Sequence, residues 1–402
     1  MKKVFLLLSF TTAVSLFAAD IQVPIFRTVE VDSKLEIGYG VVLADIDGDG
    51  MQDIVLADKN QFSWYENPTW KKHLMVENLT DRDHVCIDAR DIDGDGKAEV
   101  AVGAQWNPGE TSDAAKSGSV HYLVPAKDRT QPWKPVRLHH EPTVHRMRWI
   151  QTPGNDFELV VLPLHGRDNK GGEGAGVKAL IYKMPSNPKD VWETELIDDH
   201  MHKTHNLEIM TNLPGSNQNE VLLIAGVEGV FLFRQGDGGW RSRQIIGSEE
   251  GDTGFVGAGE VRSGNLPGGG LFVTTVEPMH GNQLVSYTPP ERGSGRRLGT
   301  RSVLFEEMAD GHALACGDLL GIGSDQIVVG WRGNRGNPEN IGIKLFIPLD
   351  GQGKEWRSVD IDPDGMACED LKLGDLDGDG RLDIVACGRS TKNLRIYFND
   401  GQ

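Results

Sequence analysis

After its first nineteen residues, the sequence contains no apolar run long enough to cross a lipid bilayer. Positive charge is also in short supply, because 41 lysine and arginine residues stand against 59 aspartate and glutamate residues, for a formal net charge of −18. Nucleic acid and anionic membrane surfaces carry the same sign of charge and would repel the protein. We therefore expect no nucleic-acid partner and no transmembrane segment in the mature chain.

Cysteine is scarce, with four residues in 402. All four fall in segments expected to form strands, without the spacing of a disulfide framework: Cys86, Cys316, Cys368 and Cys387. We interpret them as buried thiols, and a disulfide between two of them stays open. The sequence also lacks a G-x-S-x-G elbow, a P-loop, an H-E-x-x-H segment and a dinucleotide fingerprint. Serine-nucleophile, phosphoryl-transfer and zinc-protease chemistry therefore have no support.

The N-terminus has the pattern of a bacterial secretory signal. Two lysines precede an apolar run over residues 4–17, and the small residues Ala18 and Ala19 follow it. We predict a signal peptide over residues 1–19, a single mature domain over residues 20–402, and a periplasmic or secreted location.

The most informative motif is D-x-D-G-D-G-x-x-[DE] followed by an apolar strand, which occurs at residues 45–55, 91–101 and 375–385. Carboxylates at positions one, three, five and nine, with a backbone carbonyl at position seven, surround a hard cation with oxygen, and glycine at position six permits the sharp turn. We predict structural Ca²⁺ in all three loops. The expected ligands are Asp45, Asp47, Asp49, Met51 and Asp53; Asp91, Asp93, Asp95, Lys97 and Glu99; and Asp375, Asp377, Asp379, Arg381 and Asp383.

Weaker copies of the same unit recur every 45 to 60 residues, the spacing of propeller blades. Each unit has an inner strand, a loop, a β-branched strand, an aromatic strand and an outer strand. Counting gives seven units, with the inner strand of the fifth at residues 256–261. The last unit lacks its outer strand, and the segment at residues 24–31 can supply it by pairing with residues 396–398. The fold class predicted is all-β: a seven-bladed β-propeller closed by its N-terminal strand.

These loops resemble the FG-GAP or VCBS repeats of calcium-loop propellers over nearly the whole mature chain. Residues 164–169, 204–208 and 310–313 are similar to histidine-bearing segments of the aldos-2-ulose dehydratase propeller. That resemblance implies elimination of water from a ketosugar. The fungal enzyme has additional cupin-like sequence that this chain lacks, so the resemblance does not extend to an isomerase activity of such a region.

Several histidines share one position in the repeat. His84, His145, His205 and His312 each lie just before the inner strand of a blade, and Tyr39 and Glu369 hold comparable places in blades one and seven. These positions converge at one mouth of a propeller channel. A single such histidine is more often a hydrogen-bonded strand end, but four together indicate a transition-metal site or an acid and base pair.

Loops that join the second and third strands should open onto the same mouth. Residues 105–118 and 164–177 are insertions of this kind, and the second contains His165 and Arg167. His280 holds the equivalent place in blade five, and Trp331 and Arg332 hold it in blade six. Planar and charged side chains of these types bind sugars by stacking and hydrogen bonding.

Our first hypothesis is a carbohydrate lyase that works by dehydration or β-elimination. His145 or His205 would remove the acidic proton, a divalent metal on neighbouring histidines or Arg167 would stabilise the enolate-like oxygen, and His165 or Tyr39 would protonate the leaving oxygen. The residues assigned to substrate binding are His84, His280, His312, Trp331, Arg332 and Glu369.

Two alternatives stay open. One is a non-catalytic propeller that binds a glycan or a protein at the same mouth and uses calcium for rigidity. The other is a glycoside hydrolase, for which Glu208 and Glu369 are the first carboxylates to test.

Overall fold

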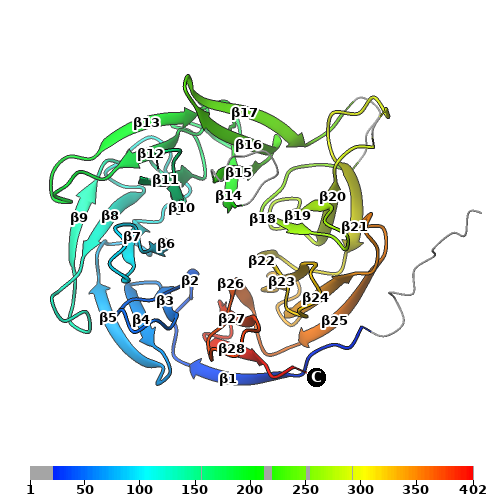
Figure 1. Ribbon diagram of the computed structural model, residues 1–402. Helices are drawn as coiled ribbons and strands as arrows, with labels where there is room; N and C mark the ends of the chain where they lie inside the picture. The colour runs from blue at the N-terminus through cyan, green and yellow to red at the C-terminus, as the bar shows by residue number, and fades with distance from the viewer. Residues whose placement is uncertain (1–20, 155, 212–219, 250–253, 292, 402) are drawn as a thin grey trace, which may run out of the picture.

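The computed structural model describes residues 21–401 except 155, 212–219, 250–253 and 292. Seven four-stranded antiparallel sheets are arranged around a central axis (Figure 1), which confirms the predicted propeller. None of the described residues form a helix that is long and apolar enough to span a membrane. The predicted signal segment lies outside the described residues.

Each blade runs from an inner strand at the axis to an outer strand at the rim (Figure 1). The inner strands are β2 (Gly40–Ala44), β6 (Cys86–Arg90), β10 (Val144–Gln151), β14 (Thr204–Met210), β18 (Val261–Asn265), β22 (Gly311–Gly317) and β26 (Cys368–Gly374). The second strands are β3 (Asp53–Ala57), β7 (Glu99–Ala104), β11 (Phe157–Pro163), β15 (Val221–Gly226), β19 (Leu271–Glu277), β23 (Gln326–Trp331) and β27 (Asp383–Gly388). The third strands are β4 (Gln61–Glu66), β8 (Ser119–Val124), β12 (Ala179–Lys183), β16 (Gly229–Gly236), β20 (Gln283–Thr288), β24 (Gly342–Pro348) and β28 (Leu394–Asn399). The outer strands are β5 (Lys71–Glu77), β9 (Lys134–Leu138), β13 (Glu193–Asp198), β17 (Gly239–Ile246), β21 (Thr300–Phe305), β25 (Trp356–Asp362) and β1 (Phe26–Asp32).

The last blade is closed by the first strand, as predicted. Strand β1 pairs antiparallel with β28, and Val29 lies opposite Ile396. The inner strand of blade five was predicted too early: β18 begins at Val261 rather than at residue 256. Gly257 has a φ of 108°, which interrupts an extended strand, and Val256 is exposed.

The core lies between adjacent blades, because each sheet packs on a neighbour at both faces. The second strands are accordingly buried along their whole length in several blades, including β3, β7 and β27. The aromatic third strands fill the same layers, with Trp64 of β4 fully buried. The four cysteines are free thiols; three are buried, as expected, and Cys316 is partly buried.

The loops between first and second strands tie neighbouring blades together. In blade seven, the Asp383 carboxylate accepts the backbone N–H groups of Leu376 (2.9 Å) and Asn399 (2.9 Å). The Asn399 side-chain amide in turn donates to the carbonyl of Leu319, in the loop of blade six (2.8 Å). The carboxylate at position nine of the loop motif, Asp383, therefore fixes Asn399, and Asn399 holds the loop of the preceding blade.

The same arrangement recurs in blade one, and in blade two an arginine makes the link, with Arg129 3.5 Å from the position-nine carboxylate of Glu99. Asp53 accepts the N–H groups of Ile46 (2.9 Å) and Asn67 (2.8 Å), and the Asn67 amide donates to the carbonyl of Leu376 in blade seven (2.8 Å). In blade two, Arg129 donates to the carbonyl of Ile46 in blade one (3.0 Å). Four consecutive blades are thus linked loop to loop.

We predict that Asn399→Ala lowers the free energy of unfolding by about 1–3 kcal/mol, because it leaves a buried carbonyl without its donor. Urea unfolding of the purified protein measures this change. Gln131→Ala, at an exposed position, is the control and should stay within about 0.5 kcal/mol of the parent. Equal losses in the two variants would contradict a role for the link between blades.

Candidate functional site

Four inner strands begin with a β-bulge, and each bulge carries a titratable residue. The pairing registers skip one residue at His145 in β10, His205 in β14, His312 in β22 and Glu369 in β26. All four side chains are buried. A bulge places one unpaired residue in the strand and re-aims its side chain. The position that these residues share in the sequence repeat therefore corresponds to one backbone feature that recurs around the axis.

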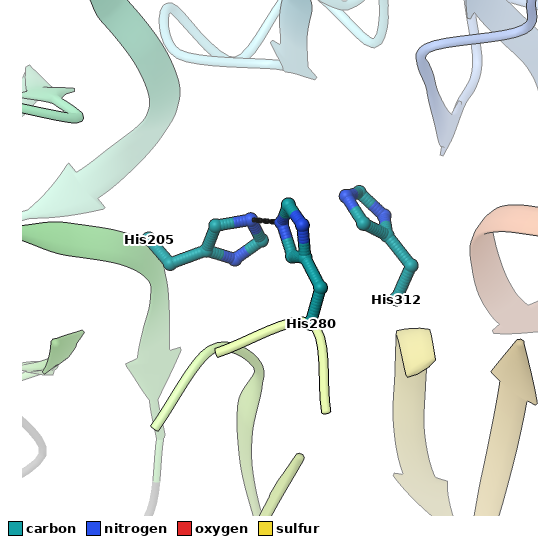
Figure 2. Close-up of side chains that lie close together, drawn as sticks. All are labelled: His205, His280 and His312. Atoms are coloured by element: carbon teal, nitrogen blue, oxygen red, sulfur yellow. Dashed lines mark hydrogen bonds between the residues drawn. The ribbon is translucent and has the colours of Figure 1, made fainter. Parts of the chain in front are cut away.

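His205 and His312 meet His280, which comes from the loop between β19 and β20 (Figure 2). Their ring centroids are 5.3 Å apart for His205 and His312, 4.4 Å for His205 and His280, and 4.8 Å for His280 and His312. The Nε2 atoms of His205 and His280 lie within hydrogen-bond distance of each other. One nitrogen from each ring falls within 4.8 Å of the other two. We call these three residues the histidine centre.

The second ring nitrogen of His205 and that of His312 each lie next to an oxygen atom. His312 Nδ1 lies 2.6 Å from the backbone carbonyl of Glu369, and His205 Nδ1 lies 3.2 Å from Glu260 Oε1. His280 Nδ1 is more loosely placed, at 3.6 Å from Asp310 Oδ1. An oxygen acceptor on Nδ1 favours the tautomer whose Nε2 lone pair is free, which is the usual arrangement around metal-binding imidazoles, and His312 shows it. At His280 the Arg332 guanidinium also lies 3.4 Å from Nδ1. The hydrogen bond between the Nε2 atoms of His205 and His280 requires one of these two atoms to carry the proton.

His145 takes a different place beside the centre. Its Nδ1 donates to the His205 carbonyl (2.9 Å), and its Nε2 accepts from the Arg146 guanidinium (2.9 Å). The ring also stacks on Trp106, with centroids 4.9 Å apart. Both nitrogens are therefore occupied, and this side chain supports the backbone of His205.

All four imidazoles favour the neutral form. Burial is the largest cause and lowers the pKa of His145, His205, His280 and His312 below the usual value of 6.5. The Glu260 carboxylate opposes this effect at His205. Neutral imidazole near pH 7 is the form that binds a metal ion.

Guanidinium and carboxylate groups surround the centre on one side. Arg332 donates to Asp310 (2.8 Å) and to Glu369 (2.6 Å), and Arg389 also donates to Glu369 (2.9 Å). The Glu369 carboxylate is thus held between two cations, with its side chain 2% exposed. His280, Arg389 and Asp310 are the most accessible of these residues, at 40%, 39% and 23% side-chain exposure, so solvent reaches the centre from their side.

Tyr39 and Arg167, which were also predicted for the site, form hydrogen bonds outside the histidine centre. Tyr39 donates its hydroxyl to Asp83 (2.7 Å), and burial raises its pKa. Arg167 pairs with Glu141 (2.8 Å) and also donates to the Ser112 carbonyl (3.0 Å). These contacts hold loops of the mouth in place.

Three further predicted residues pack into the protein. Trp331 is 5% exposed and donates its indole N–H to Asn340 (2.8 Å), so it offers no open stacking face. His84 is fully buried and stacks on Phe62 at 4.4 Å. The backbone of His165 hydrogen bonds with the Thr143 hydroxyl.

Four residues beside the centre were not predicted as site residues from the sequence: Glu260, Asp310, Arg146 and Trp106. Glu260 stands at the start of its inner strand, as the histidines of β10, β14 and β22 do, although it directly precedes β18 whereas they are the second residue of their strands. The early placement of this strand concealed that signal. Arg146 directly follows His145 and Asp310 lies two residues before His312, but their contacts depend on side-chain directions across blades.

The three acidic loops bring some of their predicted ligands together. The carboxylates at positions one, three and nine converge in each loop: Asp45, Asp47 and Asp53; Asp91, Asp93 and Glu99; and Asp375, Asp377 and Asp383. At position five, Asp49 accepts the N–H of Met51 (2.8 Å), Asp95 accepts that of Lys97 (2.8 Å), and Asp379 pairs with Arg381.

Comparison with known families agrees with this architecture. Residues 117–289 match the aldos-2-ulose dehydratase beta-propeller domain, residues 45–102 match an FG-GAP-like repeat, and residues 87–123 match the FG-GAP repeat. No curated protein matches the sequence.

Several solved structures share the fold at low sequence identity. A chain from BBS1N in complex with ARL6DN is 13% identical, with a TM-score of 0.54, and the match covers 94% of this chain and 97% of that chain. An Agrocybe aegerita lectin that recognises non-reducing terminal N-acetylglucosamine is 15% identical, with a TM-score of 0.53 and coverage of 90% and 91%. A chain of the mitotic checkpoint complex is 11% identical, with a TM-score of 0.56 and coverage of 99% and 98%.

We predict that His84 makes the fold sensitive to acid. Burial lowers its pKa to about 4, so between pH 6.5 and 4 the unfolded chain binds a proton that the folded chain does not. The free energy of unfolding should therefore fall as pH decreases, by about 2 kcal/mol between pH 7 and pH 5. His84→Phe keeps a ring on Phe62 and should remove this share of the pH dependence in urea unfolding.

The matched control is His139→Phe at an exposed position, which should leave the pH profile of the parent in place. Parallel profiles for the parent protein and His84→Phe would contradict the assignment.

Proposed function

We propose that this protein is a secreted or periplasmic carbohydrate lyase that uses a metal ion at the histidine centre. The observation that carries the proposal is the convergence of His205, His280 and His312, with the Nδ1 atoms of His205 and His312 next to oxygen. The match to the aldos-2-ulose dehydratase propeller supports a carbohydrate-related role. The signal pattern at the N-terminus supports a location outside the cytoplasm.

The residues of the centre fit a divalent transition metal. Three neutral imidazoles are a common ligand set for Zn²⁺ and related ions, and a fourth position is then left for water or substrate. Glu260 and the Glu369 carbonyl would orient two of the ligands. When bound, such an ion polarises a carbonyl oxygen and stabilises the enolate-like charge that forms on it.

The open side of the centre supplies the groups that would act on a sugar. Arg332 holds Asp310 in place (2.8 Å), and its NH2 group lies 3.4 Å from His280 Nδ1. We assign the proton acceptor to Asp310, because His145 has both ring nitrogens occupied and His205 would be a ligand. The Asp310 carboxylate would take the proton from the carbon next to the carbonyl.

One carboxyl group can serve the whole elimination. After the C–H bond breaks, a carbon–carbon double bond forms and the β-oxygen leaves. Asp310 would return its proton to that oxygen, so that water or an alcohol departs and the carboxylate is restored. Arg332 would keep the carboxylate oriented throughout.

We also propose that the three acidic loops bind calcium for stability. Each gathers carboxylates at positions one, three and nine, which are the hard oxygen ligands that calcium prefers. Bound calcium would compensate repulsion among these acids at the links between blades.

We predict that elemental analysis of the purified protein finds about one transition-metal ion per chain in addition to calcium. The double variant His205→Ala/His280→Ala should lose the transition metal and keep calcium, because the two kinds of site share no ligand. His139→Ala should retain both metals. A parent protein without transition metal, or a double variant that keeps it, would overturn the proposed centre.

We predict a rising enone absorbance when the metal-loaded protein is incubated with ketosugars or uronate polysaccharides. Asp310→Asn should lower kcat by about 100-fold or more while metal content stays unchanged, because the amide cannot accept the proton. Asp237→Asn, at an exposed position in the turn between β16 and β17, is the control. Full metal loading without any absorbance change would instead favour the non-catalytic binding propeller.

A further inference from the structure

A second pocket lies between blades one and two, with a volume of about 270 Å³. Its walls come from three places: the connection between β5 and β6, the loop between β7 and β8, and strands β8 and β9. The lining residues are Leu79, Thr80, Asp81, Gln105, Ala115, Ser119, His121 and Arg137. The first two segments lie at the ends of strands that face the mouth of the channel.

Two buried side chains in this pocket have unused hydrogen-bonding atoms. Ser119 is 1% exposed and His121 is 6% exposed, and both line the pocket. Ser119 Oγ and His121 Nδ1 have no hydrogen-bond partner among the residues that the structure describes. Both atoms have almost no accessible surface in this conformation, so they would reach a ligand by rotation of their side chains. A hydrogen bond to the ligand would then remove the free-energy cost of leaving a buried polar atom without a partner.

The rest of the lining is mixed in character and balanced in charge. Arg137 lies directly across from His121 in the strand pair and donates to His140 (3.1 Å), which leaves further guanidinium N–H groups. Asp81 contributes a carboxylate and Gln105 an amide. Burial lowers the pKa of His121 to about 4, so the imidazole is neutral near pH 7. The lining therefore carries one cation, Arg137, and one anion, Asp81.

These properties select the class of ligand. Most pockets for small molecules are largely apolar and measure about 300–1,000 Å³, whereas this one is smaller and is lined mainly by polar groups. A balanced charge disfavours a free anion or cation. Donors and acceptors close together suit neighbouring hydroxyl groups, each of which donates and accepts a hydrogen bond.

We propose that this pocket binds one neutral pyranose ring through Ser119, His121 and Arg137. It is separate from the histidine centre but close to it along the chain: Gln105 lines the pocket, and the next residue, Trp106, stacks on His145. A saccharide of several units could therefore be held by one ring in the pocket. The binding itself does not depend on metal or catalysis, so this proposal and the proposed lyase activity fail separately.

The test is isothermal titration with methyl α-D-glucopyranoside, methyl α-D-mannopyranoside and methyl β-D-galactopyranoside, with sodium glucuronate as the charged comparison. We expect at least one neutral glycoside to bind with a Kd of roughly 1–10 mM. Ala115→Phe places a ring in the pocket from an exposed loop position and should weaken binding at least tenfold. Ser119→Ala removes a single hydroxyl and should weaken it severalfold.

Lys116→Phe, at the next exposed position, is the matched control and should bind as the parent does. The double variant His205→Ala/His280→Ala should also retain glycoside binding. Absence of binding by all three glycosides, binding of glucuronate alone, or full affinity in Ala115→Phe would overturn the proposal. Loss of binding in the histidine double variant would overturn it as well, because it would place the sugar at the centre.

Discussion

The β-bulge at the start of an inner strand is the constraint on which the candidate site depends. A regular inner strand in a propeller sends alternate side chains to the two faces of its blade, where they pack against neighbouring blades. The extra residue of a bulge escapes this alternation. His205 and His312 reach a common point because both occupy such positions, and Glu369 does the same in blade seven.

Glu369 connects the ligands to the charges around them. Its backbone carbonyl sets the orientation of His312, and its carboxylate holds Arg332 and Arg389. Arg332 in turn orients Asp310, at the solvent side of the centre. One residue therefore serves both the imidazole geometry and the arrangement of ions. The neutral histidines are compatible with this setting because the surrounding guanidinium groups already have carboxylate partners.

The sequence repeat was sufficient to predict seven blades and the closing strand, because loop acids and strand periodicity are local signals. It also identified the shared position of His145, His205 and His312. The division of roles among them depended on neighbours from other blades, such as the Arg146 contact that occupies His145. Trp331 was assigned to the mouth from its place after an apolar strand, but its indole packs inside the blade. The sequence repeat does not determine the direction of side chains at the ends of strands.

The pairing of β1 with β28 also orders the events of folding. Residues 26–32 have no strand partner nearby in the sequence, because they pair with residues 394–399 at the other end of the chain. Blades one to six can each form from contiguous segments, but the ring closes only by contact between the two ends of the fold. That last step carries the loop-closure entropy of nearly the entire chain. Until it occurs, β1 and β28 each present an unpaired edge, and the nascent protein is most open to association with other chains.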